Sequence, residues 1–204
     1  MSKLQKRIID ITYQERMSHL SSVLSAAPII EEIYAKKADD EVFVLSNGHA
    51  GLALYCKLEQ LYAEVDAVEL LHKHGIHPNR DLPNHLHVST GSLGSGLPIA
   101  VGHALATPDR TVYCMISDGE CAEGSIWESL RFIADHPVDN IEVYANINGM
   151  GAYDMIDTDL LTRRLQAFLP RINIRISKPT DFSFAKGLQT HYHVLSDNDY
   201  ASLK

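Results

Sequence analysis

The segment that most constrains the fold runs from Ser117 to Met150, because its pattern predicts a β-α-β unit. The apolar, β-prone run at residues 111–116 precedes it and predicts a buried strand. A helical pattern follows, with apolar residues on one face at Ile126, Leu130 and Ile133. His136-Pro137 ends this helix, since a residue before proline avoids the α region. Ile141–Ala145 predicts a second strand, parallel to the first.

Polar residues follow both predicted strands, with Asp118 after the first and Asn148 after the second. Ligands of open α/β sheets bind outside the carboxyl ends of the strands, where neighbouring parallel strands would bring these residues together. A carboxylate, an amide oxygen and a nearby main-chain carbonyl suit a small hard cation such as Mg²⁺. Gly119 allows close approach of a phosphate, and the amides after it favour negative charge. The residues alone therefore predict a magnesium–diphosphate site, although Asp-Gly and Asn-Gly are also ordinary turn dipeptides.

The same stretch resembles the thiamine-diphosphate fingerprint of the transketolase family. The similarity lies in Asp118-Gly119, in Asn148 thirty positions later, and in the intervening Glu120, Glu123-Gly124, Trp127-Glu128 and Val138–Ile141. Three positions depart from the family: Ser117 replaces a glycine, Asn146 stands where Asp is frequent, and Gly151 replaces a polar residue. The resemblance implies that Asp118, Asn148 and the Met150 carbonyl hold Mg²⁺ (or Ca²⁺), and that Gly119 and Glu120 bind the cofactor.

Four further segments resemble the family and imply roles for individual side chains. The residues concerned lie in Ser18–Ala27, Leu45–Tyr55, His77-Pro78 and Thr90–Leu105. By this resemblance His19 and His77 face the substrate, and His49 holds the diphosphate. Gly91 and Leu93 would border the aminopyrimidine ring. Near the end of the chain His191 is the expected diphosphate-side histidine, with His193 as the alternative.

The residues alone leave other interpretations of these histidines open. His19 suits a surface turn, and His49 suits a capping or core position. The histidine-rich stretch 74–87 also raises a zinc site, which we rank low because no cysteine is near.

The pattern as a whole predicts an α/β fold, with a mostly parallel sheet and helices on both faces. We expect residues 1–204 to form a single thiamine-diphosphate domain of the diphosphate-binding (PP) type, with a shortened C-terminal part. Ser25 is the expected N-cap of a helix over residues 26–36, with Pro28 in its first turn. The other expected elements are helices near 3–17, 50–62, 66–73, 97–105 and 157–168, and strands at 41–45 and 172–176.

Composition bears on the binding partners and on the cellular compartment of the protein. A net charge of −8 argues against binding to a nucleic-acid backbone. The cysteines have no metal-binding spacing, and Cys56 and Cys114 lie in apolar runs that predict buried thiols. We expect a reducing, cytoplasmic compartment, because no segment has the pattern of a signal peptide or a membrane span.

The resemblance covers about residues 5–200 and only the diphosphate-binding half of a transketolase. It implies a second subunit with the pyrimidine-binding and C-terminal domains, in a heterotetramer with two copies of each subunit. The implied reaction transfers a two-carbon ketol unit from a ketose or ketose phosphate to an aldehyde. Two alternatives remain: one component of a 2-oxoacid dehydrogenase or decarboxylase, and a scaffold subunit without cofactor. Glu123 and Glu128 are expected to be structural or interface acids.

Overall fold

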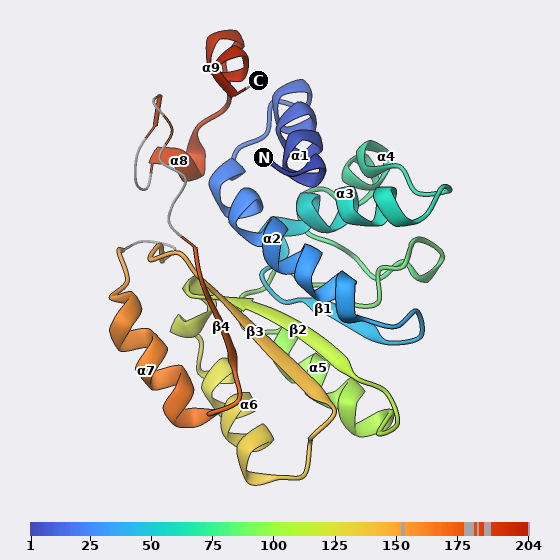
Figure 1. Cartoon of the computed structure of the whole chain (residues 1–204), viewed down its shortest axis with the longest axis vertical. Coiled ribbons are helices and arrows are strands. Elements are labelled where there is room, and N and C mark those ends of the chain that lie inside the picture. Colours follow the sequence, from blue (N-terminus) through green and yellow to red (C-terminus); the bar gives the residue numbers. More distant parts are fainter. Residues whose placement is uncertain (152–153, 178–181, 183, 186–188, 204) are drawn as a thin grey trace.

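In the computed structural model, four parallel strands form the centre of the part of the chain that the structure describes (Figure 1). The structure describes residues 1–151, 154–177, 182, 184–185 and 189–203, with Thr190 and His191 described in their backbone alone. The strands lie in the order β1-β2-β3-β4 and comprise β1 Val42–Leu45, β2 Val112–Ser117, β3 Ile141–Ile147 and β4 Asn173–Ile176. Every pair of neighbours is parallel, so the carboxyl ends of all four strands meet at one edge of the sheet.

Alternation along the strands divides the core into two hydrophobic clusters. In β2, Tyr113 and Met115 pack into one cluster, whereas Val112, Cys114 and Ile116 pack into the other. All six residues of β2 are buried, which is typical of a parallel strand covered on both faces. The predicted fold class, a mostly parallel sheet with helices on both faces, is therefore confirmed.

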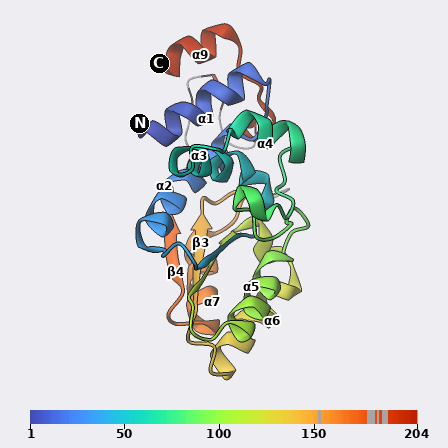
Figure 2. The same cartoon turned by 90° about the vertical axis from the view of Figure 1, so that its right-hand side faces the viewer.

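On one face of the sheet, α2 Leu20–Lys36 packs against β3. Three further helices pack with α2 into the first cluster: α1 Lys3–Gln14, α3 Gly51–Leu61 and α4 Ala67–His74. The helices of the second cluster are α5 Gly96–Ala106, α6 Gly124–Asp135 and α7 Thr158–Phe168. Figure 2 shows the elongated outline, with α1, α3 and α4 towards one end and α5 to α7 towards the other. Short 3₁₀ turns are η1 Gly48–Ala50, η2 Leu82–Asn84 and η3 Gly119–Ala122.

The start of α2 differs from the prediction. The helix begins at Leu20 rather than Ala26, so Ser25 is not an N-cap and Pro28 lies inside the helix. The small polar residues before Ser25 suggested a break, but Leu20, Val23 and Leu24 are buried in the core. Burial of this face outweighs the weak helix propensity of serine. Pro28 lies on the exposed face of the helix.

The two ends of the described chain pack against each other through α1 and α9 Asp197–Leu203. The Tyr200 hydroxyl donates a 2.6 Å hydrogen bond to Asp10, and the Tyr200 ring stacks on Tyr13. The short helix α8 Gln189–Tyr192 precedes α9 and lies on the α2 side of the molecule (Figure 1). Across the part of the chain that the structure describes, every helix is too short or too polar to cross a membrane.

Candidate functional site

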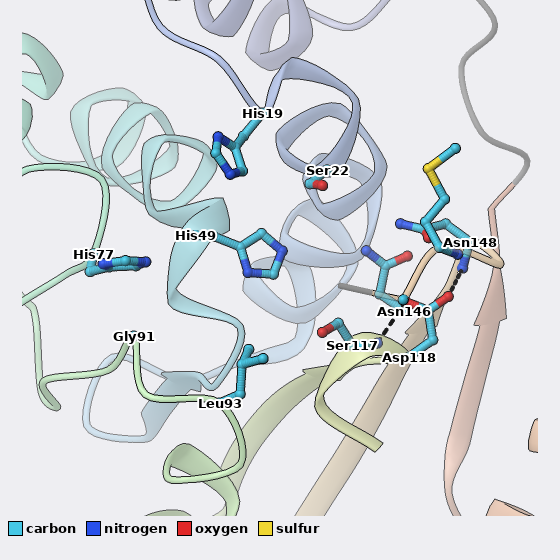
Figure 3. A pocket seen from close by; sticks show the side chains of 13 residues that line it. His19, Ser22, His49, His77, Gly91, Leu93, Ser117, Asp118, Asn146 and Asn148 are labelled. Atoms are coloured by element: carbon cyan, nitrogen blue, oxygen red, sulfur yellow. Dashed lines mark hydrogen bonds between the residues drawn. The ribbon is translucent and has the colours of Figure 1, made fainter. Parts of the chain in front are cut away.

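A cavity of about 200 Å³ lies at the carboxyl ends of β1, β2 and β3 (Figure 3). Five separate segments form its wall: the start of α2, the turn after β1, the loops before α5, and the ends of β2 and β3. The lining residues are His19, Ser22, His49, His77, Gly91, Leu93, Ser117, Asp118, Gly119, Asn146, Asn148, Met150 and Gly151. The β-α-β unit thus brings its two polar strand ends into one site, at the edge where α/β sheets bind ligands.

Asp118 joins the loop after β2 to the loop after β3. Its Oδ2 accepts hydrogen bonds from the backbone amides of Asn148 at 2.8 Å and Gly149 at 2.7 Å. Oδ1 accepts a third bond from the Gly119 amide. Burial raises the pKa of the Asp118 carboxyl, and the three amide donors oppose that rise. The backbone thereby holds a buried carboxylate in place before any ligand binds.

The loop after β3 presents further oxygen atoms next to Asp118. Asn148 Oδ1 accepts a hydrogen bond from the Met150 amide at 2.9 Å, which fixes the side-chain amide. Gly149 has φ +82°, a backbone conformation that favours glycine. The donor set of one carboxylate, one amide oxygen and one main-chain carbonyl fits Mg²⁺ or Ca²⁺. The structure therefore brings the three predicted metal ligands, Asp118, Asn148 and Met150, to one wall of the cavity.

Among the described side chains, three histidines from three different segments face the same cavity. His19 precedes α2 with φ +69°, and its ring centroid lies 6.4 Å from that of His49. His49 lies in η1 directly before α3, a place suited to an anion. In Figure 3, His49 lies between His77 at one side and Asp118 at the other. The site is thus acidic at one end and lined by histidines elsewhere.

Glycines allow the backbone to come close to the histidines. Gly91 has φ +136°, and a Cβ atom there would lie 2.8 Å from the His77 ring. A Cβ at Gly48 would lie equally close to the Gly91 amide nitrogen. Leu93, on the same loop, lines the cavity as predicted. The glycine-rich loop is consequently packed so closely that these two positions exclude a side chain.

Glu120 lies behind the cavity wall and is not among the residues that line it. Its carboxylate is fully buried and accepts bonds from the Ser46 hydroxyl, the Gly94 amide and the Ser117 amide. Burial raises the pKa of Glu120, and these donors oppose the rise. The geometry gives Glu120 an indirect role: it holds the glycine-rich loop against the ends of β1 and β2.

Two histidines, His191 and His193, lie near the end of the chain. The side chain of His191 lies outside the described residues, so its predicted contact with the diphosphate stays a prediction. His193 instead pairs with Asp199 at 2.9 Å and stacks on Phe184, and it does not line the cavity. In the histidine-rich stretch 74–87, for which a zinc site was considered, His74 pairs with Asp81 and His85 stacks on Tyr62. The described residues include no group of three or more His, Cys, Asp or Glu side chains arranged to hold a metal.

Four lining residues had no role in the sequence-based prediction: Ser22, Ser117, Asn146 and Gly151. Ser22 lies one helical turn after His19, and this spacing could have indicated it. Asn146 had been noted only as a departure from the family. Its side chain donates to Ser25 and accepts from Ser177, which fixes the end of β3.

Comparisons with known proteins agree with this geometry. Residues 68–151 match the family model described as thiamine pyrophosphate enzyme, C-terminal TPP binding domain. The chain is 31% identical over 193 residues to transketolase-like protein 2 of Bos taurus. This match covers 82% of this chain and 30% of the Bos taurus protein. It is 30% identical over 158 residues to one subunit of the apulose-4-phosphate transketolase of Phocaeicola vulgatus, covering 68% of this chain and 56% of that subunit. Among solved structures, transketolase from Leishmania mexicana superposes with a TM-score of 0.74 at 20% identity, over 98% of this chain and 39% of that one.

The chain has the thiamine-diphosphate-binding fold. Most of its length is similar to transketolases, and residues 68–151 match a thiamine-pyrophosphate-binding domain. The chain spans about a third of the Bos taurus relative and just over half of the Phocaeicola vulgatus one.

Proposed function

We propose that residues 1–204 form the diphosphate- and metal-binding domain, with a shortened C-terminal part, of a two-component transketolase-like enzyme. The enzyme transfers a two-carbon ketol unit from a ketose or ketose phosphate to an aldehyde. The observation that carries this proposal is the buried Asp118 carboxylate, held by the Asn148 and Gly149 amides at adjoining strand ends. A site of this donor chemistry, in a chain similar to transketolases, fits Mg²⁺ and thiamine diphosphate.

Three groups of residues would hold the cofactor and its metal ion. Asp118, Asn148 Oδ1 and the Met150 carbonyl would hold the metal ion. Gly119 and His49 would bind the diphosphate together with His191, and Gly91 and Leu93 would border the aminopyrimidine ring. When bound, thiamine diphosphate supplies the carbanion chemistry by which carbon–carbon bonds break and form.

The remaining histidines would act on the substrate. His19 and His77 line the cavity away from Asp118, where their ring nitrogens are able to bind donor hydroxyls and to hold or move a proton. A hydroxylated sugar needs such polar contacts, whereas a 2-oxoacid offers fewer hydroxyls to bind. The three cavity histidines therefore favour a transketolase over a 2-oxoacid dehydrogenase or decarboxylase.

A second subunit would supply the pyrimidine-binding and C-terminal domains, in a heterotetramer. The relative from Phocaeicola vulgatus, which is named as one subunit of an apulose-4-phosphate transketolase, supports both this division and a sugar-phosphate substrate. The alternative of a scaffold without cofactor is opposed by the assembled Asp118–Asn148 pair, which a scaffold does not need.

The first test is an affinity pull-down of the chain from its native lysate with Mg²⁺ and thiamine diphosphate, analysed by mass spectrometry. We expect a stoichiometric partner with transketolase C-terminal sequence. The recovered complex should transfer a ketol unit between sugar phosphates, and neither component should do so alone. Recovery of the chain only in self-associated form would contradict the two-component mechanism. A complex that fails to bind magnesium–thiamine diphosphate would support the scaffold instead.

A further inference from the structure

Ser117 has a buried hydroxyl whose hydrogen-bonding capacity is unused. The residue is 4% exposed, and its Oγ has no hydrogen-bond partner within the described part of the chain. Its backbone is fully engaged by comparison: the amide donates to Glu120, and the carbonyl accepts a weak bond from the Cys121 thiol. Burial of a hydroxyl without a partner is unfavourable, so such a group in a native site calls for an acceptor.

The neighbouring side-chain oxygens bond to other donors and not to Ser117. Asp118 accepts hydrogen bonds from three backbone amides. Asn146, paired with Ser117 in the strand register, accepts from Ser177, and Asn148 accepts from Met150. Because none of the described oxygens lies in hydrogen-bonding geometry to the Ser117 hydroxyl, its acceptor would come from outside the described residues.

The hydroxyl is placed where a ligand would supply that acceptor. Ser117 lines the cavity directly beside Asp118 and Gly119. Figure 3 shows its side chain pointing into the cavity, towards the side on which Leu93 and His49 lie. Phosphate oxygens are strong acceptors and form short, strong bonds with hydroxyl donors.

We propose that Ser117 is a further cofactor-binding residue, whose hydroxyl donates a hydrogen bond to a diphosphate oxygen of the bound ligand. This inference rests on the proposed thiamine-diphosphate site, and it gives that site one donor more than the transketolase pattern, which has glycine at this position. The serine would thus increase affinity for the diphosphate at the expense of the stability of the ligand-free chain.

Ser117→Ala tests the inference, because the two properties should change in opposite directions. In isothermal titration with magnesium–thiamine diphosphate, the Kd should rise roughly 10- to 100-fold, the range expected for a bond to a charged group. The ligand-free melting temperature should stay the same or rise by about 1–4 °C, because an unsatisfied buried group is removed. Wild type and variant are compared in the same form, as the full chain or as the recovered complex.

Two controls locate the effect. Ser129→Ala removes a buried hydroxyl that donates to the Ser125 carbonyl within α6, away from the cavity, and it should leave the Kd unchanged. Magnesium pyrophosphate, used as a second probe, should lose affinity for Ser117→Ala to a similar degree, since it carries the same diphosphate group.

The other outcomes overturn the inference. Equal affinity of Ser117→Ala and wild type would mean that water satisfies the hydroxyl, with the cofactor site itself intact. A lower melting temperature together with weaker binding would indicate a purely structural hydroxyl. A loss for thiamine diphosphate but not for pyrophosphate would place the contact elsewhere on the ligand. No binding by the wild-type complex would remove both this inference and the proposed function.

Discussion

Glu120 and Ser46 connect the ends of two neighbouring strands, because the Ser46 hydroxyl donates a 2.6 Å hydrogen bond to Glu120 Oε1. The two residues are 74 positions apart in the sequence, and both are completely buried. Through the Gly94 amide, the same carboxylate also holds the loop that carries Gly91 and Leu93. The shape of the cavity therefore depends on a residue that does not line it.

Glu120→Gln should destabilise the fold by about 2 kcal/mol. The new side-chain NH₂ group would face a hydrogen-bond donor that now donates to the carboxylate. Urea unfolding measures this change. Glu128→Gln, on the exposed face of α6, is the matched control and should stay within about 0.5 kcal/mol of wild type. An equal effect of the two substitutions would mean that Glu120 has no special structural role.

Asp118→Asn should abolish detectable metal-dependent binding of thiamine diphosphate, with a loss of at least about 100-fold, because the metal site loses its charge. Isothermal titration with and without Mg²⁺ is the measurement. Asp135→Asn, at the far end of α6 and 61% exposed, provides a control of equal chemistry. Retained magnesium-dependent binding in Asp118→Asn would exclude Asp118 as a metal ligand.

His49→Ala and His77→Ala should separate cofactor binding from turnover. We expect His49→Ala to weaken thiamine-diphosphate binding about tenfold, because a donor to the diphosphate is lost. His77→Ala should keep the cofactor Kd and lower kcat/KM of the reconstituted complex by roughly 10²-fold, the usual scale for a lost proton-transfer group. If His77→Ala weakened cofactor binding as much as His49→Ala, the assignment of His77 to the substrate would be wrong.

Gly91→Ala should be more damaging than Gly75→Ala, although both glycines have positive φ. The new Cβ at Gly91 would lie 2.8 Å from the His77 ring, whereas nothing lies within 4 Å of a Cβ at Gly75. We expect a loss of about 1–3 kcal/mol at Gly75 from backbone strain alone. Overpacking should cost Gly91→Ala about 1–2 kcal/mol more. Equal losses in urea unfolding would show that the loop relaxes away from His77.

The Glu32–Arg175 pair should make stability depend on pH in the acid range. Arg175 bonds Glu32 through two nitrogens, at 2.7 and 2.6 Å, and holds the pKa of the Glu32 carboxyl at about 2. This pKa lies below the value of roughly 4.3 that Glu32 has in the unfolded chain. The pair therefore stabilises the fold fully above about pH 4.3 and loses its effect as the pH falls towards 2. Partial exposure screens the pair, so we expect Glu32→Gln to cost about 1 kcal/mol at pH 7.

Urea unfolding of wild type and Glu32→Gln at pH 7, 4 and 2.5 measures this dependence. The difference between the two proteins should shrink towards pH 2.5. Glu31→Gln, which alters the neighbouring carboxyl, should show no such trend. A difference that stays constant with pH would exclude the ion pair as its source.

The sequence predicted the strands and most helices well, because buried parallel strands and amphipathic helices leave clear periodic patterns. It also predicted that Asp118 and Asn148 lie close together, since each follows one of two neighbouring parallel strands. The predicted start of α2 was wrong, because the burial of Leu20 and Val23 is a tertiary effect that local helix propensity does not include. The role of Glu120 was equally hidden, since its partners Ser46 and Gly94 are distant in the sequence.

The cavity wall is built from five segments that are far apart along the chain. A bound ligand would contact several of them at once, so local opening of any one segment would require at least partial release of the ligand. Binding should therefore slow amide hydrogen exchange in all five segments together, rather than near one loop. The ligand would convert separately opening parts of the molecule into a single cooperative unit.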